Sequence, residues 1–221
     1  MNIVLSYSGG LDSTVLLYQL VAHGHHVRAL SVDYGQRHVR EIRAARRICA
    51  QLGVEHRHAD LSGIRPLLAG SALTDDVAVP TGEYSLDAIR ATVVPNRNML
   101  LLATCIAWAV STRSDAVAYA AHAGDHAIYA DCRPEFAEAM ARAAALCDER
   151  PIELLRPLID LTKADIVRLG ATLGVPFAET WSCYVGGEFQ CGECPTCVER
   201  REAFALANVD DPTHYAIALS A

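Results

Sequence analysis

Short apolar runs alternate with stretches of helical periodicity through the first sixty residues of the chain. Strand-type runs cover 2–7, 27–33 and 55–61, and helical periodicity covers 11–22 and 38–52. Strands that alternate with helices of this length predict a parallel sheet with helices on both faces. Because such sheets bind ligands at the carboxyl ends of their strands, we expect a ligand site beside the turns that follow the first two strands.

The rest of the chain continues this pattern. A strand is expected over 116–121 and a polar loop over 124–133, and further helices are expected over 97–111, 134–146 and 198–207. Another helix is predicted to begin after Thr162, because Asp165 follows three residues later as the second half of a capping box.

One irregular segment, residues 62–96, interrupts the alternation. It contains several prolines and glycines and shows no sustained period, so we expect either a lid or binding loop or a plain surface excursion. The chain has 221 residues, which suffices for one α/β domain over 1–221 and is too short for two full ones.

Composition narrows the class of protein. The formal net charge of −7 argues against a protein that coats DNA or RNA, so no direct nucleic-acid partner is expected. The longest apolar stretch, 99–110, is too short to cross a bilayer, and we expect no membrane partner. We find no targeting segment and expect a cytoplasmic chain, whose eight cysteines do not form disulfides in a reducing compartment.

The most informative stretch follows the first predicted strand and reads Ser8-Gly9-Gly10-Leu11-Asp12-Ser13. The glycines allow a tight turn, whose N–H groups and following helix suit phosphate. The two serine hydroxyls can donate as well, and Asp12 can hold a Mg²⁺ that bridges phosphate oxygens. The alternative is an ordinary turn in which Asp12 or Ser13 caps the helix. The Gly-Lys-Ser/Thr sequence of the Walker loop is absent, which disfavours γ-phosphoryl transfer.

Lys163 is the only lysine of the chain. At a predicted helix start it is either incidental or a point charge that stabilises a departing pyrophosphate or an α-phosphate.

Four of the eight cysteines crowd into fifteen residues, at Cys183, Cys191, Cys194 and Cys197. Four thiolates in tetrahedral geometry suit a structural Zn²⁺, which would staple the C-terminal segment 180–207 onto the domain. The competing interpretation is an iron–sulfur cluster, because Cys-x2-Cys spacing serves both.

Residues 8–13 resemble the pyrophosphatase loop of the PP-loop superfamily of ATP-pyrophosphatases. The resemblance implies an adenine-nucleotide-hydrolase-like, Rossmann-like sandwich that binds ATP at residues 8–13 and cleaves it to AMP and pyrophosphate. Further stretches are similar to the 7-cyano-7-deazaguanine synthase (QueC) family, namely Asp33-Tyr34-Gly35-Gln36-Arg37-His38, Pro95-Asn96-Arg97-Asn98, Tyr129-Ala130-Asp131-Cys132-Arg133, Thr180-Trp181-Ser182-Cys183-Tyr184 and Asp211-Pro212-Thr213.

This second resemblance implies a carbon–nitrogen ligase of queuosine biosynthesis. It would convert 7-carboxy-7-deazaguanine and ammonia to the nitrile through acyl-adenylate and amide intermediates. The residues 126–130 depart from the family's usual sequence, which keeps an alternative open: a relative that stops at the amide or joins the acid to an amine on another molecule, such as a protein. A tRNA-modifying relative and a non-catalytic nucleotide-binding module are weaker alternatives. A homodimer is compatible with the sequence.

Residues in the matching stretches are candidates for substrate contact. Arg97 can clamp the carboxylate to be activated; the alternative is a surface ion pair. Asp131, beside Arg133, can accept a hydrogen bond from a guanine-type N–H; the alternative is a structural salt bridge between the two. Arg37 and His38 can meet phosphate or carboxylate, or they are solvated side chains at a helix start. The remaining candidates are Tyr34, Gln36, Asp125 and Tyr129.

Overall fold

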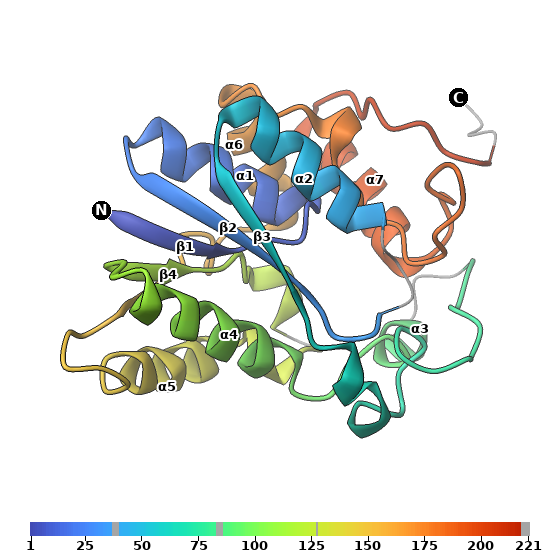
Figure 1. Ribbon diagram of the computed structural model, residues 1–221. Coiled ribbons are helices and arrows are strands. Elements are labelled where there is room, and N and C mark those ends of the chain that lie inside the picture. The colour runs from blue at the N-terminus through green and yellow to red at the C-terminus, as the bar shows by residue number, and fades with distance from the viewer. Residues whose placement is uncertain (37–39, 83–85, 127, 218–221) are drawn as a thin grey trace.

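The computed structural model describes residues 1–36, 40–82, 86–126 and 128–217 (Figure 1). Five parallel strands form one sheet in the order β3-β2-β1-β4-β5. Their bounds are β1 (Asn2–Ser6), β2 (His26–Asp33), β3 (Glu55–Asp60), β4 (Ala116–Ala118) and β5 (Glu153–Leu155). The predicted parallel sheet is therefore confirmed.

Helices cover both faces of the sheet (Figure 1). One layer consists of α1 (Leu11–Ala22), α2 (Arg40–Leu52), α6 (Lys163–Thr172) and α7 (Pro195–Ala207), and the other of α4 (Arg97–Ser111) and α5 (Pro134–Ala144). Successive side chains of a strand point to opposite faces. Ile3 and Leu5 of β1 accordingly pack into the first layer, and Val4 packs into the second.

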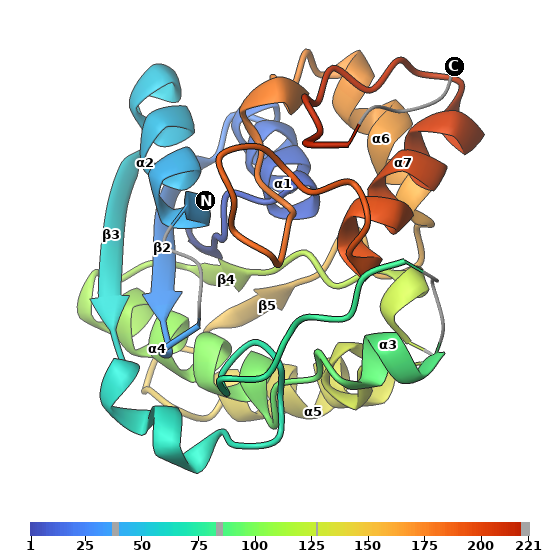
Figure 2. The same ribbon diagram turned by 90° about the vertical axis from the view of Figure 1, so that its right-hand side faces the viewer.

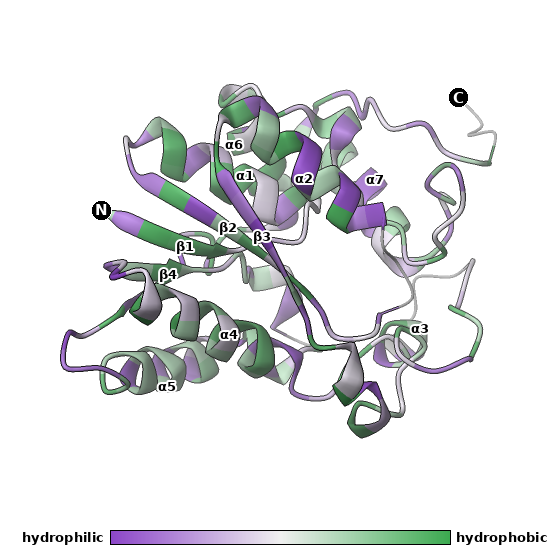
Figure 3. Cartoon of the chain, viewed as in Figure 1, coloured by the Kyte–Doolittle hydropathy of each residue, from purple (hydrophilic) through white to green (hydrophobic). Residues whose placement is uncertain are grey.

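Hydropathy follows this layering. The strands are mostly hydrophobic, whereas the outer side of α2 is hydrophilic (Figure 3). The exposed residues on that side are Arg43, Arg46 and Arg47, while Ala45 and Ile48 are buried. Within the described part of the chain, we find no helix with the length and apolar character needed to span a membrane.

Most predicted elements are confirmed, with informative differences at their ends. The helices over 11–22 and 97–111 have the expected bounds, and the capping box of Thr162 and Asp165 is present. The last helix begins at Pro195 instead of 198, because Cys194 is its N-cap and proline suits the first helical position. The three-residue strand β5 was not predicted, since so short a run shows no period.

The insert, residues 62–96, packs against the ligand edge of the sheet. It contains a 3₁₀ turn (Ser62–Leu67) and the short helix α3 (Leu86–Arg90). Leu68, Leu73 and Val94 form a small hydrophobic cluster with Tyr34, which follows β2. The amide of Gly82 donates a hydrogen bond of 3.1 Å to the carbonyl of Glu193. The insert and the cysteine-rich segment thus lie together at one side of the molecule. This side faces the viewer in Figure 2.

Candidate active site

A cavity of about 250 Å³ lies at the carboxyl ends of the strands. The first residues of four helices line it: Leu11 of α1, Arg97 of α4, Lys163 of α6 and Pro195 of α7. Each helix N-terminus carries a positive partial charge and free N–H groups. Their convergence makes the cavity suitable for a polyanion.

The turn at residues 8–13 is held by its own hydroxyls and by α2. Ser8 Oγ accepts from the amide of Gly10 at 3.1 Å and lies 3.0 Å from Ser13 Oγ. Gly9 has φ of +79°, and a Cβ there would lie 2.6 Å from the carbonyl oxygen of Glu41, so only glycine fits. Gly10 is the N-cap of α1 and no side chain caps the helix, which leaves Asp12 and Ser13 free to face the cavity.

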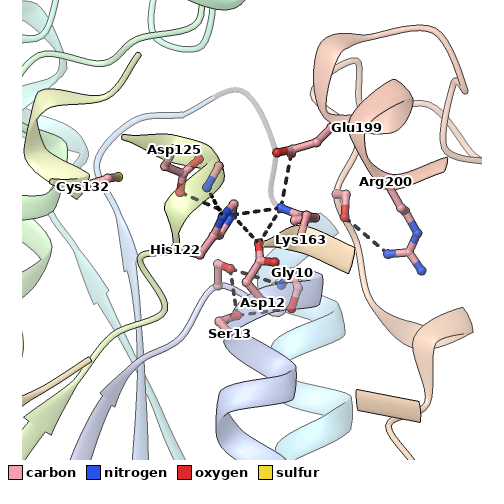
Figure 4. Close-up of polar contacts among 12 residues, drawn as sticks. Gly10, Asp12, Ser13, His122, Asp125, Cys132, Lys163, Glu199 and Arg200 are labelled. Carbon is pink, nitrogen blue, oxygen red and sulfur yellow. Dashed lines mark hydrogen bonds and ion pairs between the residues drawn. The ribbon is translucent and has the colours of Figure 1, made fainter. Parts of the chain in front are cut away.

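Asp12 and Lys163 form the centre of a charged cluster (Figure 4). Asp12 Oδ2 lies 2.7 Å from Lys163 Nζ, which also lies 3.3 Å from Glu199 Oε2. Burial alone would raise the pKa of Asp12, but Lys163 and His122 outweigh it and hold that pKa below its ordinary value. Asp12 Oδ1 is buried and has no hydrogen-bond partner among the described residues. This oxygen is therefore available to a cation.

His122 completes the cluster and was not predicted. Its ring is 1% exposed, and Nδ1 accepts a hydrogen bond of 3.1 Å from the amide of Gly124. The other ring nitrogen, Nε2, lies 3.5 Å from Asp125 Oδ2 and 3.4 Å from Lys163 Nζ. One potential ligand atom from each of His122, Asp125 and Glu199 lies within 4.8 Å of the others. Hard cations such as Mg²⁺ prefer oxygen ligands, so the carboxylates of Asp125 and Glu199 are the better ligands of this group.

A second part of the cavity wall consists of Arg97 and three tyrosines. The Arg97 guanidinium lies 5.7 Å from the ring centroid of Tyr129. Tyr34 and Tyr184 also lie near it and, with Tyr129, outweigh burial to raise the pKa of Arg97. Among the described residues no carboxylate forms an ion pair with this arginine. A half-buried cation without a paired carboxylate can receive an anionic ligand.

Some of the other predicted residues line the cavity, and some do not. Asp125, Tyr129, Tyr34 and Gln36 line the cavity. Asp131 and Arg133 do not: Asp131 Oδ2 accepts from the amide of Asn98 at the start of α4, and exposed Arg133 donates to the carbonyl of His126. Asp131 therefore holds the helix start from which Arg97 projects. Arg37 and His38 lie outside the described residues.

The four clustered cysteines form a potential metal site. Their Sγ atoms all lie within 4.8 Å of one another, and Cys183, Cys194 and Cys197 are buried. Backbone amides donate to Cys183 Sγ from Val185 and Cys191 at 3.3 Å, and to Cys191 Sγ from Cys194 at 3.2 Å. Such donors stabilise thiolates. The donor set fits a metal held by four sulfurs.

This cysteine site is connected to the cavity through the backbone. The amide of Trp181 donates to the carbonyl of Gly9 at 3.0 Å, and both Trp181 and Tyr184 line the cavity. Cys194 is the N-cap of α7, which carries Glu199. The cysteine segment thus positions one wall of the cavity.

Three residues that line the cavity, His122, Glu199 and Glu41, were not predicted from the sequence. His122 follows β4 at the ligand edge, and this position was its one indication. Glu199 and Glu41 lie on helices without a motif, and only the tertiary fold brings them to the cavity.

Comparisons with solved structures agree with the observed fold. The U34-tRNA thiolase NcsA from Methanococcus maripaludis matches with a TM-score of 0.50 at 17% identity, over 94% of this chain and 65% of that chain. A 4-thiouridine synthetase solved with RNA and bound ATP matches with a TM-score of 0.50 at 16% identity, over 94% of this chain and 52% of that one. At this identity the likeness concerns the fold alone, and the expected PP-loop, Rossmann-like architecture is confirmed.

Comparisons with curated proteins are closer. A 7-cyano-7-deazaguanine synthase of Pseudoalteromonas translucida is 46% identical over 97% of this chain and 98% of its own length. One of Rhizobium johnstonii is 50% identical over 97% of this chain and 92% of its own length. The family model described as "Queuosine biosynthesis protein QueC" matches residues 2–208. The chain therefore belongs to the QueC family.

Proposed function

We propose that this chain converts 7-carboxy-7-deazaguanine and ammonia to 7-cyano-7-deazaguanine, with cleavage of ATP to AMP and pyrophosphate. One observation carries the proposal. A single cavity contains the turn at residues 8–13, here called the phosphate-type turn, the charged cluster around Asp12 and Lys163, and the half-buried Arg97, which has no ion-pair partner among the described residues. The names of the relatives at 46% and 50% identity support the same reaction.

The charged end of the cavity would bind ATP. Amides and hydroxyls of Ser8, Gly9, Gly10, Leu11 and Ser13 face the β- and γ-phosphates in this proposal, and Lys163 stabilises the departing pyrophosphate. The carboxylates of Asp12, Asp125 and Glu199 would hold Mg²⁺, whose charge offsets that of the phosphates. His122, whose Nε2 lies 3.5 Å from Asp125 Oδ2, would help to position that carboxylate.

The arginine end would bind the acid to be activated. Arg97 would receive the carboxylate of this acid, and Tyr34, Tyr129 and Tyr184 would flank its deazaguanine ring. A carboxylate oxygen attacks the α-phosphorus and pyrophosphate leaves. Ammonia then attacks the acyl carbon, AMP leaves and a proton is released, which gives the amide. The amide oxygen then attacks the α-phosphorus of a second ATP and pyrophosphate leaves; loss of AMP and of the protons on the amide nitrogen yields the nitrile.

We further propose that Cys183, Cys191, Cys194 and Cys197 hold a structural Zn²⁺. All four tetrahedral positions would be filled by thiolates, so none remains open for a substrate. Metal analysis of the purified protein distinguishes zinc from an iron–sulfur cluster, which would also give a brown colour. None of the eight cysteines is in a disulfide, which agrees with the proposal of a reducing compartment such as the cytoplasm.

The insert 62–96 would act as a lid over the bound acyl adenylate. Ile89 of α3 lines the cavity, and the insert packs on Tyr34, which also lines it. Exclusion of water is required because water would hydrolyse the adenylate.

Mass spectrometry of the products tests the proposed reaction. The protein is mixed with ATP, Mg²⁺, 7-carboxy-7-deazaguanine and ¹⁵N-ammonium. We expect a labelled nitrile and two AMP for each nitrile. A product arrested at the amide, or AMP formation only with an added amine, would favour the alternative ligase. Absence of AMP would contradict the substrate assignment.

A further inference from the structure

Glu41 presents a carboxylate to the cavity wall from the first turn of α2, and the proposed chemistry leaves it without a role. It is half-buried and lines the cavity beside the phosphate-type turn, since Gly9 packs against its backbone carbonyl. Its Oε1 accepts a hydrogen bond of 3.1 Å from Gln36 Nε2. No ion pair of Glu41 occurs among the described residues.

Gln36 is fixed in one orientation by its own hydrogen bonds. Its Oε1 accepts from the amide of Tyr34 at 2.8 Å. Its Nε2 donates to the carbonyl of Val32 at 3.3 Å as well as to Glu41. Both amide hydrogens and the amide oxygen are therefore in use, so Gln36 positions Glu41. The second carboxylate oxygen of Glu41 has no hydrogen bond with a described residue and is available to a ligand.

An ionised carboxylate only accepts hydrogen bonds, so it selects a ligand edge with two adjacent donors. The pyrimidinone edge of a guanine-type ring offers such a pair, its ring N–H and its 2-amino group. The corresponding edge of adenine offers one donor and one acceptor, and the acceptor would face the carboxylate. The charge of Glu41 therefore matches the deazaguanine better than the base of ATP.

The position of Arg97 agrees with this assignment. Arg97 begins α4 and lines the same cavity; it forms no ion pair with Glu41, but its charge lowers the pKa of the Glu41 carboxyl. The acid to be activated carries its carboxylate on the five-membered ring, away from the pyrimidinone edge. We infer that Glu41, positioned by Gln36, determines substrate specificity by receiving the ring N–H and 2-amino group while Arg97 receives the carboxylate; this inference rests on the proposed function.

The inference also predicts a pH dependence. Burial raises the pKa of Glu41 to about 7, against the lowering effects of Gln36 and Arg97, and Asp33 at the end of β2 raises it further. The two N–H donors of the ligand favour the ionised form. Affinity for the acid should therefore fall by about tenfold per pH unit below about pH 7.

The test compares 7-carboxy-7-deazaguanine with its analogue that lacks the 2-amino group. Dissociation constants and kcat/KM for AMP formation are measured for the wild type, for Glu41→Gln and for the exposed control Glu138→Gln. We expect the wild type and control to prefer the amino-bearing acid by roughly fiftyfold, because a hydrogen bond to a charged group is lost with the analogue. In Glu41→Gln the preference should fall below about fivefold. The affinity of this variant for the acid should no longer fall below about pH 7, and its KM for ATP should be nearly unchanged.

Several outcomes would overturn the inference. A wild type that binds both acids equally rules it out without any variant. An equal loss for both acids in Glu41→Gln would mean that the residue has a general structural role, and a raised KM for ATP would mean that it contacts ATP. A wild type that forms no AMP with either acid contradicts the proposed function instead, so the two failures can be told apart.

Discussion

At the scale of single residues, the cavity is defined by charges that burial makes costly. Lys163 faces Asp12 and Glu199 closely, and their attraction outweighs burial to raise the pKa of its ammonium. Arg97 and Glu41 have no ion-pair partner among the described residues, although both line the cavity. Charged groups in such positions are retained for binding more often than for stability.

Glu41→Gln should therefore stabilise the protein at neutral pH. The pKa of Glu41 is about 7 in the folded chain and 4.5 in the ordinary carboxyl. Between these pH values the folded state binds more protons than the unfolded state, so the free energy of unfolding decreases as the pH rises from 4.5 to 7. The neutral amide has no such loss. We expect the advantage of the variant in free energy of unfolding to grow by on the order of 2 kcal/mol between pH 5 and pH 8.

Urea unfolding at the two pH values measures this difference. Exposed Glu138→Gln is the control and should follow the wild type at both. Parallel curves for wild type and Glu41→Gln would mean that Glu41 is ionised as easily in the folded chain as in the unfolded one.

The residues of the site differ in how far the sequence could identify them. Ser8 to Ser13 are contiguous, so a local pattern carries their chemistry, and Arg97 follows a proline turn at a predicted helix start. Asp131 was expected beside the substrate, yet it caps α4, because a carboxylate near a helix start serves either purpose. His122 follows β4 and Glu199 lies on α7, so only the tertiary fold brings them together at the ligand edge.

At the scale of elements, the phosphate-type turn depends on a helix from a later part of the chain. The turn packs on α2 at Gly9 and bonds to the cysteine segment through Trp181. The helices over 11–22 and 97–111 were predicted well for different reasons. In α4 the buried residues Leu102, Cys105, Ile106 and Ala109 share one side, whereas α1 is an apolar helix buried on all sides over residues 13–17. The start of α7 was missed because its cap is a cysteine, which is not a usual N-cap.

Gly9→Ala tests the contact between the turn and α2. The new Cβ would meet two backbone atoms of α2 at 2.6 Å, so we expect a loss of about 2–4 kcal/mol in unfolding free energy and little AMP formation. The matched control is Gly24→Ala, which has a similar positive φ with nothing within 4 Å and should cost about 1 kcal/mol. Equal effects of the two substitutions would show that α2 yields to the added atom.

Cys194→Ser tests the metal site apart from helix capping. Serine is a good N-cap, so α7 keeps its cap while one thiolate is lost. We expect bound metal to fall from about one per chain to near zero and Tm to fall by roughly 10 °C or more. The control is exposed Cys147→Ser, which should match the wild type in both metal analysis and thermal unfolding. A stable metal-free Cys194→Ser would contradict a structural metal.

At the scale of the whole molecule, three distant segments form one side of the cavity. The insert contacts the cysteine segment through the Gly82 amide and through Val79, which packs on the cysteine cluster. The cysteine segment in turn holds the turn at Gly9. The strand and helix alternation predicted the sheet, but an irregular insert has no period, so its docking could not be anticipated.

Removal of the metal should loosen this side as a unit. We expect a chelator to increase hydrogen exchange at the Gly82 amide and across 180–194, while amides of α5 on the opposite layer stay protected. Hydrogen exchange with mass spectrometry, with and without restored metal, measures this. Unchanged exchange at Gly82 would show that the insert docks independently of the metal.

The single lysine of the chain gives this enzyme a built-in reporter. Lys163 is 16% exposed and its ammonium is held protonated, so amine-directed reagents should label the N-terminus first and Lys163 only when the cavity opens. The rate of the slow labelling phase would then report the rate at which the cavity opens, because the chain has no other lysine to react. A ¹³C-methyl group placed there by reductive methylation would yield one NMR resonance for each state of the cavity.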